Sequence, residues 1–174
     1  RLLMLGFMSQ DRVLGPLSQE IDHVNQYLEL ERIRLSKRIQ FEWDIASDVL
    51  PHAVPCPLFI LQPLVENAIW HGLCEGVEKP AIKISIRWMD QDLLIFVSDN
   101  GKGLQPLASK SNGHKSRGTA IVRERLALLR HRGELKIQDC PDNHPFIQGV
   151  TSKLHLPLWA LEPAWHESEK RMAG

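Results

Sequence analysis

The sequence predicts an α/β two-layer sandwich, in which a mixed, mostly antiparallel sheet lies under three helices. One observation is helical: apolar residues recur at the spacing of a single helix face within 18–35, 61–72 and 119–132. The other is the alternation of apolar and polar residues in 39–45 and 81–88, which is typical of strands that bury one face. Elements of both kinds have one apolar face, and such faces pack as layers around one core.

The composition indicates one domain, or one domain with appendages. The chain has 174 residues, 43% of them hydrophobic, which is enough for a sizeable core. Lys and Arg number 21 and Asp and Glu also number 21, so the zero net charge gives no global electrostatic case for nucleic acid or an anionic membrane. Cys56, Cys74 and Cys140 have neither metal-site nor paired spacing and are expected to be reduced thiols of an intracellular protein.

The first third of the chain is expected to be mainly helical. Residues 1–12 have the pattern of a helix end, and Gly15-Pro16 interrupts it. A long helix follows, with Ser18 as its N-cap and with Glu20 and Asp22 near the positive end of its dipole. Its inward stripe consists of Ile21, Val24, Leu28, Ile33 and Leu35. Its solvated face consists of Glu29, Glu31, Arg32, Arg34, Lys37 and Arg38.

The remainder is expected to build the sheet and the last helix. Strands are predicted at 39–45, at 81–88 paired in a hairpin with 93–97, and at the closing segments 135–137 and 150–156. The polar segment 103–118 is predicted to be a mobile loop, because a loop this long inside a compact domain is usually functional. The helix at 119–132 is expected to point four side chains inward, namely Ile121, Val122, Leu126 and Leu129.

The segment Leu61–Gly72 combines an apolar helical stripe with polar residues that a core helix would not favour. Asn67 and His71 stand four residues apart and therefore share a face, and Gly72 is placed to end the helix as a C′ residue. An Asn carbonyl is a hard, neutral oxygen ligand that suits Mg²⁺ held between protein and phosphates. The alternative is a core helix whose Asn and His are satisfied by backbone partners.

A second motif, Asp99-Asn100-Gly101-Lys102-Gly103, follows the apolar strand 93–97. Alone it is equally typical of a hairpin turn. In this order, however, the two motifs resemble the N box (LQPLVENAIWHG) and the first glycine box (DNGKG) of the GHKL, or Bergerat-fold, ATP-binding domain. They are most similar to the LytS-like branch of bacterial sensor histidine kinases. A third match is RERLALL at 123–129, and the resemblance covers residues 14–158.

The resemblance implies a role for each motif residue, with ATP and Mg²⁺ as cofactors. Asp99 would accept a hydrogen bond from the adenine amino group, with Gly101 and Gly103 letting the backbone approach the base. Asn67 would ligate Mg²⁺. The remaining candidates are Gly118 and Thr119 at a helix N-terminus facing phosphates, His71 as a phosphate donor or a packed histidine, and Glu66 in a supporting role.

The second glycine box departs from the family pattern. The usual form resembles GxGLxNVRxRL, whereas residues 116–126 read SRGTAIVRERL, with one glycine replaced and Ile121 where Asn is usual. Fewer glycines give the backbone less freedom to surround phosphates, although Arg117 or Thr119 can supply side-chain donors. Trp70 also stands where a Lys often contacts phosphate.

The resemblance implies the ATP-binding catalytic domain of a two-component histidine kinase, which transfers the γ-phosphate to a histidine on an upstream domain. The altered glycine box favours a second hypothesis, a nucleotide-binding regulatory module without transfer activity. A third hypothesis is a GHKL ATPase that hydrolyses ATP with Glu66 as the base. No segment resembles the family's phosphoacceptor motif NPHFLFN, so this chain is expected to bind ATP without completing its own phosphotransfer.

The same resemblance divides the chain and names its partners. Residues 1–36 would be a remnant of the dimerisation region with a connecting helix, 37–158 the catalytic domain, and 159–174 a C-terminal tail. Expected partners are a phosphoacceptor domain of the same or a sister chain, a response regulator and a second copy in the full-length homodimer. The domain is expected to be cytoplasmic, in a protein anchored in the bacterial inner membrane.

Overall fold

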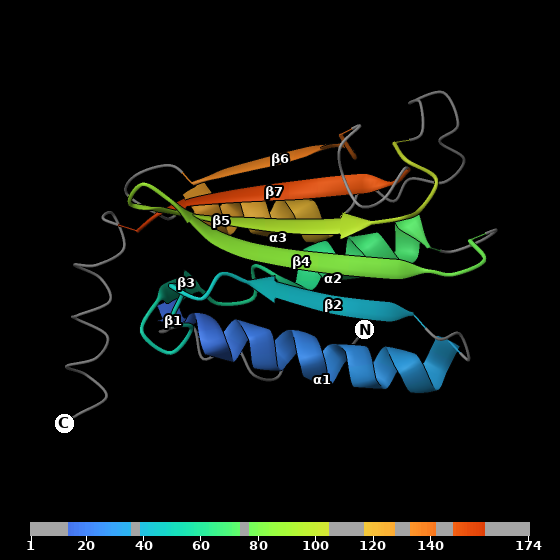
Figure 1. Ribbon diagram of the computed structural model, residues 1–174, viewed down its shortest axis with the longest axis horizontal. Helices are drawn as coiled ribbons and strands as arrows, with labels where there is room; N and C mark the ends of the chain where they lie inside the picture. The colour runs from blue at the N-terminus through green and yellow to red at the C-terminus, as the bar shows by residue number, and fades with distance from the viewer. Residues whose placement is uncertain are drawn as a thin grey trace.

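The computed structural model describes residues 14–35, 39–73, 77–104, 117–127, 133–141 and 148–158. Its main sheet has five strands in the order β2-β4-β5-β7-β6, seen edge to edge in Figure 1. The strands are β2 (Gln40–Ile45), β4 (Ala81–Met89), β5 (Asp92–Asp99), β6 (Glu134–Asp139) and β7 (Val150–Pro157). Strand β2 is parallel to β4, and the other neighbouring pairs are antiparallel. The predicted mixed, mostly antiparallel sheet is therefore confirmed.

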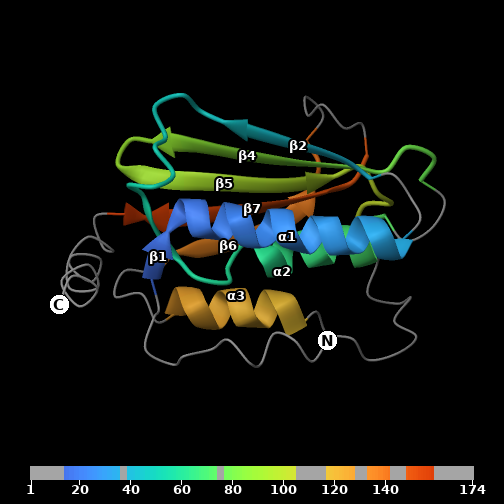
Figure 2. The same cartoon turned by 90° about the horizontal axis from the view of Figure 1, so that it is seen from below.

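Three helices form the second layer. They are α1 (Leu17–Leu35), α2 (Gln62–Asn67), which continues into the π-helical turn η2 (Ala68–Gly72), and α3 (Arg117–Ala127). Figure 2 shows all three on one side of the sheet. Helix α2 contacts both α1 and α3, so it is the middle helix of the layer. The two-layer arrangement predicted from the sequence is thus present, with α2 at its centre.

The core lies between the inner face of the sheet and the helices. Ile82, Ile84 and Ile86 of β4 face inward and are at most 1% exposed, as their alternation predicts. Leu64 and Val65 of α2 are equally buried on the helix side. Each such side chain contributes about 1.5–3 kcal/mol on burial, so this interface fixes which face of α2 is left for polar contacts.

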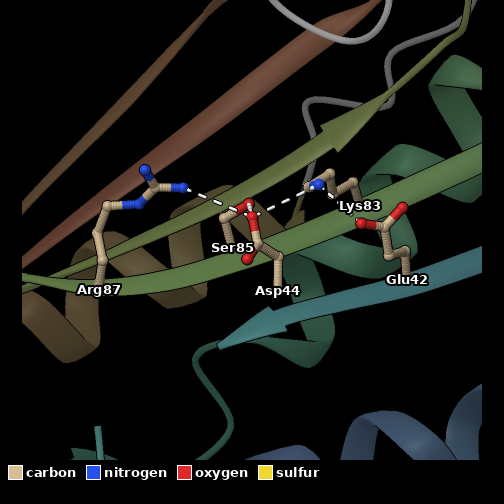
Figure 3. Close-up of polar contacts among 5 residues, drawn as sticks. All are labelled: Glu42, Asp44, Lys83, Ser85 and Arg87. Carbon is tan, nitrogen blue, oxygen red and sulfur yellow. Dashed lines mark hydrogen bonds and ion pairs between the residues drawn. The ribbon is translucent and has the colours of Figure 1, made fainter. Parts of the chain in front are cut away.

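The outer face of β2 and β4 carries the charged residues of the same alternation. Lys83 Nζ lies 2.7 Å from Glu42 Oε1 and 3.4 Å from Asp44 Oδ2, and Arg87 lies 3.7 Å from Asp44. Figure 3 shows these side chains together on the outer face. The hydrogen bond to Glu42 is the main cause of a raised pKa of Lys83. Because these side chains meet solvent, the network is expected to contribute little stability.

A small second sheet was not anticipated. Residues expected only to interrupt a helix form β1 (Leu14–Pro16), which pairs antiparallel with β3 (Pro55–Pro57). This pairing joins the start of α1 to the loop that leads into α2. Local sequence gives no sign of it, because the two partners are about forty residues apart and both are rich in proline.

Three helix residues were assigned to the wrong environment. Ile33 is 82% exposed and Ile121 42% exposed, whereas Glu31 is only 5% exposed. In α1 the buried stripe passes through Val24, Leu28 and then Glu31. Ile33 is two residues beyond Glu31 and so points about 200° around the helix. The apolar side chain of Ile33 suggested burial, but the position of each residue around the helix axis decides which residues of α1 are buried.

Several predictions lie outside the described residues. They concern the helix end at 1–12, the loop at 105–116, the end of the last helix at 128–132 and the tail at 159–174. Cys56 and Cys140 are free thiols, and Cys74 is not described. None of the described helices is both long enough and apolar enough to cross a membrane.

Neighbouring residues of β4 allow a test of the two faces of the sheet. Ile84→Ala is expected to lower the free energy of unfolding by about 2–5 kcal/mol, because it leaves a cavity under the helices. Lys83→Met is expected to cost about 1 kcal/mol or less, because the ion pairs it removes are on the outer face. Urea unfolding monitored by circular dichroism measures both. A larger loss in Lys83→Met than in Ile84→Ala would contradict this assignment of the faces.

Candidate functional site

The N-box segment does not form one continuous α-helix. It is α-helical from Gln62 to Asn67, with Pro63 in the first turn as predicted, and then widens into η2. Leu73 N donates to Ala68 O at 3.2 Å, which is the five-residue hydrogen bond of a π turn. Gly72 belongs to this turn and is not the left-handed C′ residue that the sequence suggested. Single π turns inside helices occur frequently at functional sites.

The π turn brings Gly72 against the first glycine box. A Cβ on Gly72 would lie 2.5 Å from Asp99 Oδ1, and a Cβ on Gly101 would collide with the carbonyl of Gly72. Both positions therefore require glycine because the two backbones touch. The family resemblance implied that position 101 is a glycine because the backbone there approaches the nucleotide base. Here, the close approach is to Gly72 of the N-box segment.

Asp99 is almost completely enclosed at the end of β5. Its side chain is 3% exposed, and Oδ1 accepts hydrogen bonds from Gly101 N at 2.9 Å and from Val150 N at 3.4 Å. Burial raises the pKa of this carboxyl, and the two N–H donors partly oppose that rise. A carboxylate held by one oxygen in a desolvated position is well suited to recognise a single amino group.

Other backbone features support the same turn. Gly103 has φ +77°, and a Cβ there would lie 3.0 Å from Asp139 Oδ1. Asn100 does not face a ligand: its Oδ1 accepts from Ala81 N and its Nδ2 donates to Lys79 O, both at 2.8 Å. A hollow of about 380 Å³ lies beside the turn, lined by Val77, Glu78, Lys79, Asn100, Gly101, Lys102 and Gln148.

Asn67 is at the other end of η2 and faces α3. A Cβ on Gly118 would lie 3.2 Å from Pro63 O and 3.5 Å from Asn67 Nδ2, so the first turn of α3 packs directly on α2. Thr119, the next residue of α3, is buried. Asn67 and the N-terminus of α3 therefore meet at one end of η2, and Asp99 lies at the other end.

Glu66 and Trp70 are turned toward α1. Glu66 Oε1 accepts from Gln62 Nε2 at 3.1 Å, and the guanidinium of Arg34 lies 4.4 Å from the centre of the Trp70 ring. Burial, followed by the carboxylates of Glu31 and Glu66, raises the pKa of Tyr27 on α1. The side chain of His71 is not described, so its assignment stays a prediction.

Sequence reasoning missed two contributors to this arrangement. Val150 N reaches Asp99 because β7 pairs with β5, and only the long-range strand register brings them together. Asn100 was read as part of a ligand motif, but its side chain pins the loop before β4. The one sequence feature that could have pointed to the contact between Val150 and Asp99 is the glycine at position 149, directly before the strand 150–156.

The protein-family comparison matches residues 58–160 to the histidine kinase-, DNA gyrase B-, and HSP90-like ATPase family. The chain belongs to this family. The matched residues run from the turn before α2 to the end of β7, so they include both motifs and every sheet neighbour of Asp99. The chain is therefore an ATP-binding domain of the GHKL type that sensor histidine kinases carry.

Named relatives agree with this family. The chain is 37% identical over 95 residues to the sensor histidine kinase BtsS of Escherichia coli, covering 55% of this chain and 17% of BtsS. It is 33% identical over 137 residues to the sensor protein LytS of Oceanobacillus iheyensis, covering 72% of this chain and 23% of LytS. The chain thus spans about a fifth of the length of these relatives.

A solved structure supports the fold. The catalytic domain of histidine kinase ThkA, in a nucleotide-free form, superposes with a TM-score of 0.58 at 18% identity. The match covers 83% of this chain and 95% of the ThkA domain. At this level of identity the likeness concerns the fold alone.

Asp99→Asn is expected to weaken ATP binding about tenfold or more. The amide keeps one acceptor oxygen but loses the charged acceptor for an amino group, a hydrogen bond of about 1.5–3 kcal/mol. Calorimetric titration of ATP into wild type and variant measures the change. Asp92→Asn, which removes a carboxylate from the other end of β5, is the control and is expected to bind ATP as wild type does.

The same substitution has a defined effect on stability. The pKa of Asp99 is raised in the folded state, so the folded protein binds its proton at a higher pH than the unfolded chain. Wild-type stability therefore falls as the pH rises through that pKa, and the Asn variant lacks this loss. The free energy of unfolding, measured with urea between pH 4 and 8, should rise for the Asn variant relative to wild type as the pH increases. The opposite trend would mean that the carboxylate is stabilised in the fold.

Proposed function

We propose that this chain is the ATP-binding catalytic domain of a sensor histidine kinase, which transfers the γ-phosphate of ATP to a histidine on another domain. One observation carries the proposal: Asp99 and Asn67, from separate motifs, lie at the two ends of the short turn η2. The five residues of η2 span at most about 7.5 Å, because an α-helix rises about 1.5 Å per residue and a wider π turn rises less. That separation is compatible with one nucleotide contacting both residues.

Asp99 would hold the adenine end. Its carboxylate is buried, and its hydrogen bonds to the backbone N–H groups of Gly101 and Val150 fix its orientation. A preorganised acceptor of this kind costs little reorganisation when the base binds. A hollow lined by Asn100, Gly101 and Lys102, the residues directly after Asp99, is the proposed place for the adenine ring.

Asn67 would hold the metal end. In the ranges that the structure describes, no group of three His, Cys, Asp or Glu side chains could hold a metal ion, so an all-protein metal cage is not available there. Mg²⁺ commonly takes one or two protein oxygens and completes its shell with substrate phosphates and water, which fits a single Asn. When bound, Mg²⁺ neutralises charge on the phosphates during transfer.

The first turn of α3 would complete the phosphate site. Gly118 and Thr119 lie there, next to Asn67, and the unpaired N–H groups of a helix N-terminus attract anions. One glycine of the second glycine box is replaced in this chain. The Thr119 hydroxyl is a side-chain group that could donate to a phosphate oxygen there. His71 remains a candidate phosphate donor from the same segment as Asn67.

The position of Glu66 favours transfer over hydrolysis. Its carboxylate bonds to Gln62 and lies near Tyr27, on the α1 side of α2, whereas Asn67 faces α3. A base that activates water must reach the γ-phosphate. A kinase acceptor needs no such base, because a neutral imidazole is already nucleophilic. We therefore assign Glu66 a supporting role rather than that of a hydrolytic base.

The rest of the full-length protein is inferred from its relatives. Because this chain spans about a fifth of BtsS and LytS, the phosphoacceptor histidine is proposed to lie on a separate domain of the same or a sister chain. We also propose a homodimer, a cognate response regulator and a cytoplasmic position below a bacterial membrane anchor, as the resemblance to LytS-like sensor kinases implies. Residues 1–36 are proposed as the connection to the upstream domain, 37–158 as the catalytic domain and 159–174 as a tail.

Asn67→Ala is expected to abolish the part of ATP affinity that depends on Mg²⁺. Wild type should bind ATP at least about tenfold more tightly with Mg²⁺ than with EDTA, whereas the variant should bind equally under both conditions. Calorimetric titration with ATP supplies the two affinities. Asn25→Ala is the matched control, because Asn25 is an exposed residue of α1 that accepts from Trp43 Nε1 of β2. A wild type that binds ATP in neither buffer would defeat the proposed function.

The variant Glu66→Gln distinguishes phosphate transfer to a histidine from hydrolysis of ATP. With a phosphoacceptor domain of a LytS-like kinase added in trans and γ-labelled ATP, wild type should label the acceptor, and the variant should retain at least about a tenth of that rate. Phosphate release without the acceptor should be slow in both proteins. Rapid steady phosphate release that Glu66→Gln abolishes would favour the ATPase hypothesis and overturn the kinase assignment.

A further inference from the structure

A buried carboxylate of α1 is bonded to the backbone just before α2. Glu20 is 0% exposed, and Oε1 accepts from Phe59 N at 2.6 Å. Oε2 accepts from Ile60 N at 2.8 Å and from Leu61 N at 3.0 Å. One side chain thus satisfies three consecutive N–H groups about forty residues away in the sequence. The sequence had suggested that Glu20 would act on the dipole of its own helix.

These bonds hold the backbone directly before α2, a helix that has no side-chain N-cap. Leu61 occupies the cap position and makes no side-chain capping bond, so the helix supplies no acceptor of its own there. Unpaired N–H groups at a buried helix start are costly, and a negative charge at that end also interacts favourably with the helix dipole. Phe59 has φ +60°, a conformation that a non-glycine residue rarely adopts. Glu20 therefore maintains a strained backbone that presents all three N–H groups to it.

Helix α1 makes further contacts along the same side of α2. The ring of His23 stacks on Phe59, with ring centres 5.1 Å apart, and Arg34 covers the ring of Trp70 in η2. The backbone just before α2 and the turn η2 that follows it are therefore both in contact with α1. On its other side, the segment presents Asn67 to α3.

We propose that Glu20 is a positioning residue for the nucleotide site. By holding the three N–H groups before α2, it fixes the place of that helix along its axis, and therefore the place of Asn67. Leu61 and Asn67 are six residues apart, about 9 Å along a helix. The Asp99 carboxylate accepts from Gly101 N, in the turn after β5, and from Val150 N of β7, two hydrogen bonds that involve neither α1 nor α2. The proposal rests on the proposed function, and it predicts that loss of the Glu20 bonds affects the metal end and spares the adenine end.

The proposal gives α1 a route to the active site. Any displacement of α1 along its axis acts through Glu20 on α2 and moves Asn67 relative to Asp99. Because both ends of a bound MgATP must be satisfied together, such a displacement changes nucleotide affinity without any contact between α1 and the nucleotide. The structure thus couples the helix proposed to lead to the upstream domain with the phosphate end of the site.

Glu20→Gln keeps the size of the side chain but places an amide NH₂ opposite backbone N–H donors. It is expected to weaken MgATP binding about tenfold or more, the effect of losing a charge-assisted hydrogen bond. The affinity for ATP in EDTA should stay within about twofold of wild type. Glu29→Gln is the matched control, because Glu29 lies on the same helix, is 68% exposed and pairs with Arg32. Titration calorimetry on the purified chain, with both buffers, gives all six affinities.

The outcomes separate cleanly. A wild type that binds MgATP, with Glu20→Gln binding equally well, overturns the role of Glu20 and leaves the proposed function intact. An equal loss in both buffers also overturns it, because Glu20 would then support the whole domain. A wild type without nucleotide binding defeats the proposed function itself.

A second measurement needs only wild type, in case Glu20→Gln does not fold. Coupling is reciprocal, so MgATP should slow hydrogen exchange of the Phe59, Ile60 and Leu61 amides, and ATP in EDTA should not. Mass spectrometry of peptides spanning 59–72 reads this protection. Equal exchange of these amides with MgATP and with metal-free ATP would overturn the proposal.

Discussion

The close approach of two backbones, at Gly72 and Gly101, is the constraint on which the site depends. It fixes the end of η2 against the end of β5 and encloses the Asp99 carboxylate between them. A side chain at either glycine would separate the two motifs by at least its own Cβ. The π turn has the same consequence, because it places Gly72 against Asp99 while Asn67, at the end of α2, stays against Gly118 of α3. The nucleotide motifs are therefore one structural unit, although Gly72 and Gly101 are 29 residues apart in the sequence.

Helix α2 divides the helical layer into two sides with different chemistry. Its α3 side carries Asn67 beside Gly118, and its α1 side carries Glu66 and Trp70. The first side is the one proposed to face the nucleotide, and the second is the side contacted by α1, whose Glu20 bonds to the backbone just before α2. Under the proposal, a shift of α2 along its axis moves the residues on both of its sides. This short helix can therefore link the position of α1 to the proposed phosphate site.

Sequence patterns predicted the fold well wherever burial follows local periodicity. The alternation in β4 placed Ile82, Ile84 and Ile86 correctly on the inner face, and the motif order led to the family that the comparisons confirm. The phase of α1 was read less well, and Ile33 and Glu31 exchanged the environments expected of them. The bonds of Glu20 to residues 59–61 and of Val150 to Asp99 could not be predicted, because they depend on packing between segments 40 to 50 residues apart.

The central claim is that Asp99 and Asn67 contact opposite ends of one nucleotide. A crystal structure of this chain with Mg²⁺ and a non-hydrolysable ATP analogue tests it directly. The account predicts the adenine amino group within about 3.2 Å of a carboxylate oxygen of Asp99. It also predicts a metal ion about 2.1 Å from Asn67 Oδ1 that bridges to the phosphates. A nucleotide bound through only one of these two side chains, or lodged elsewhere on the sheet, would contradict it.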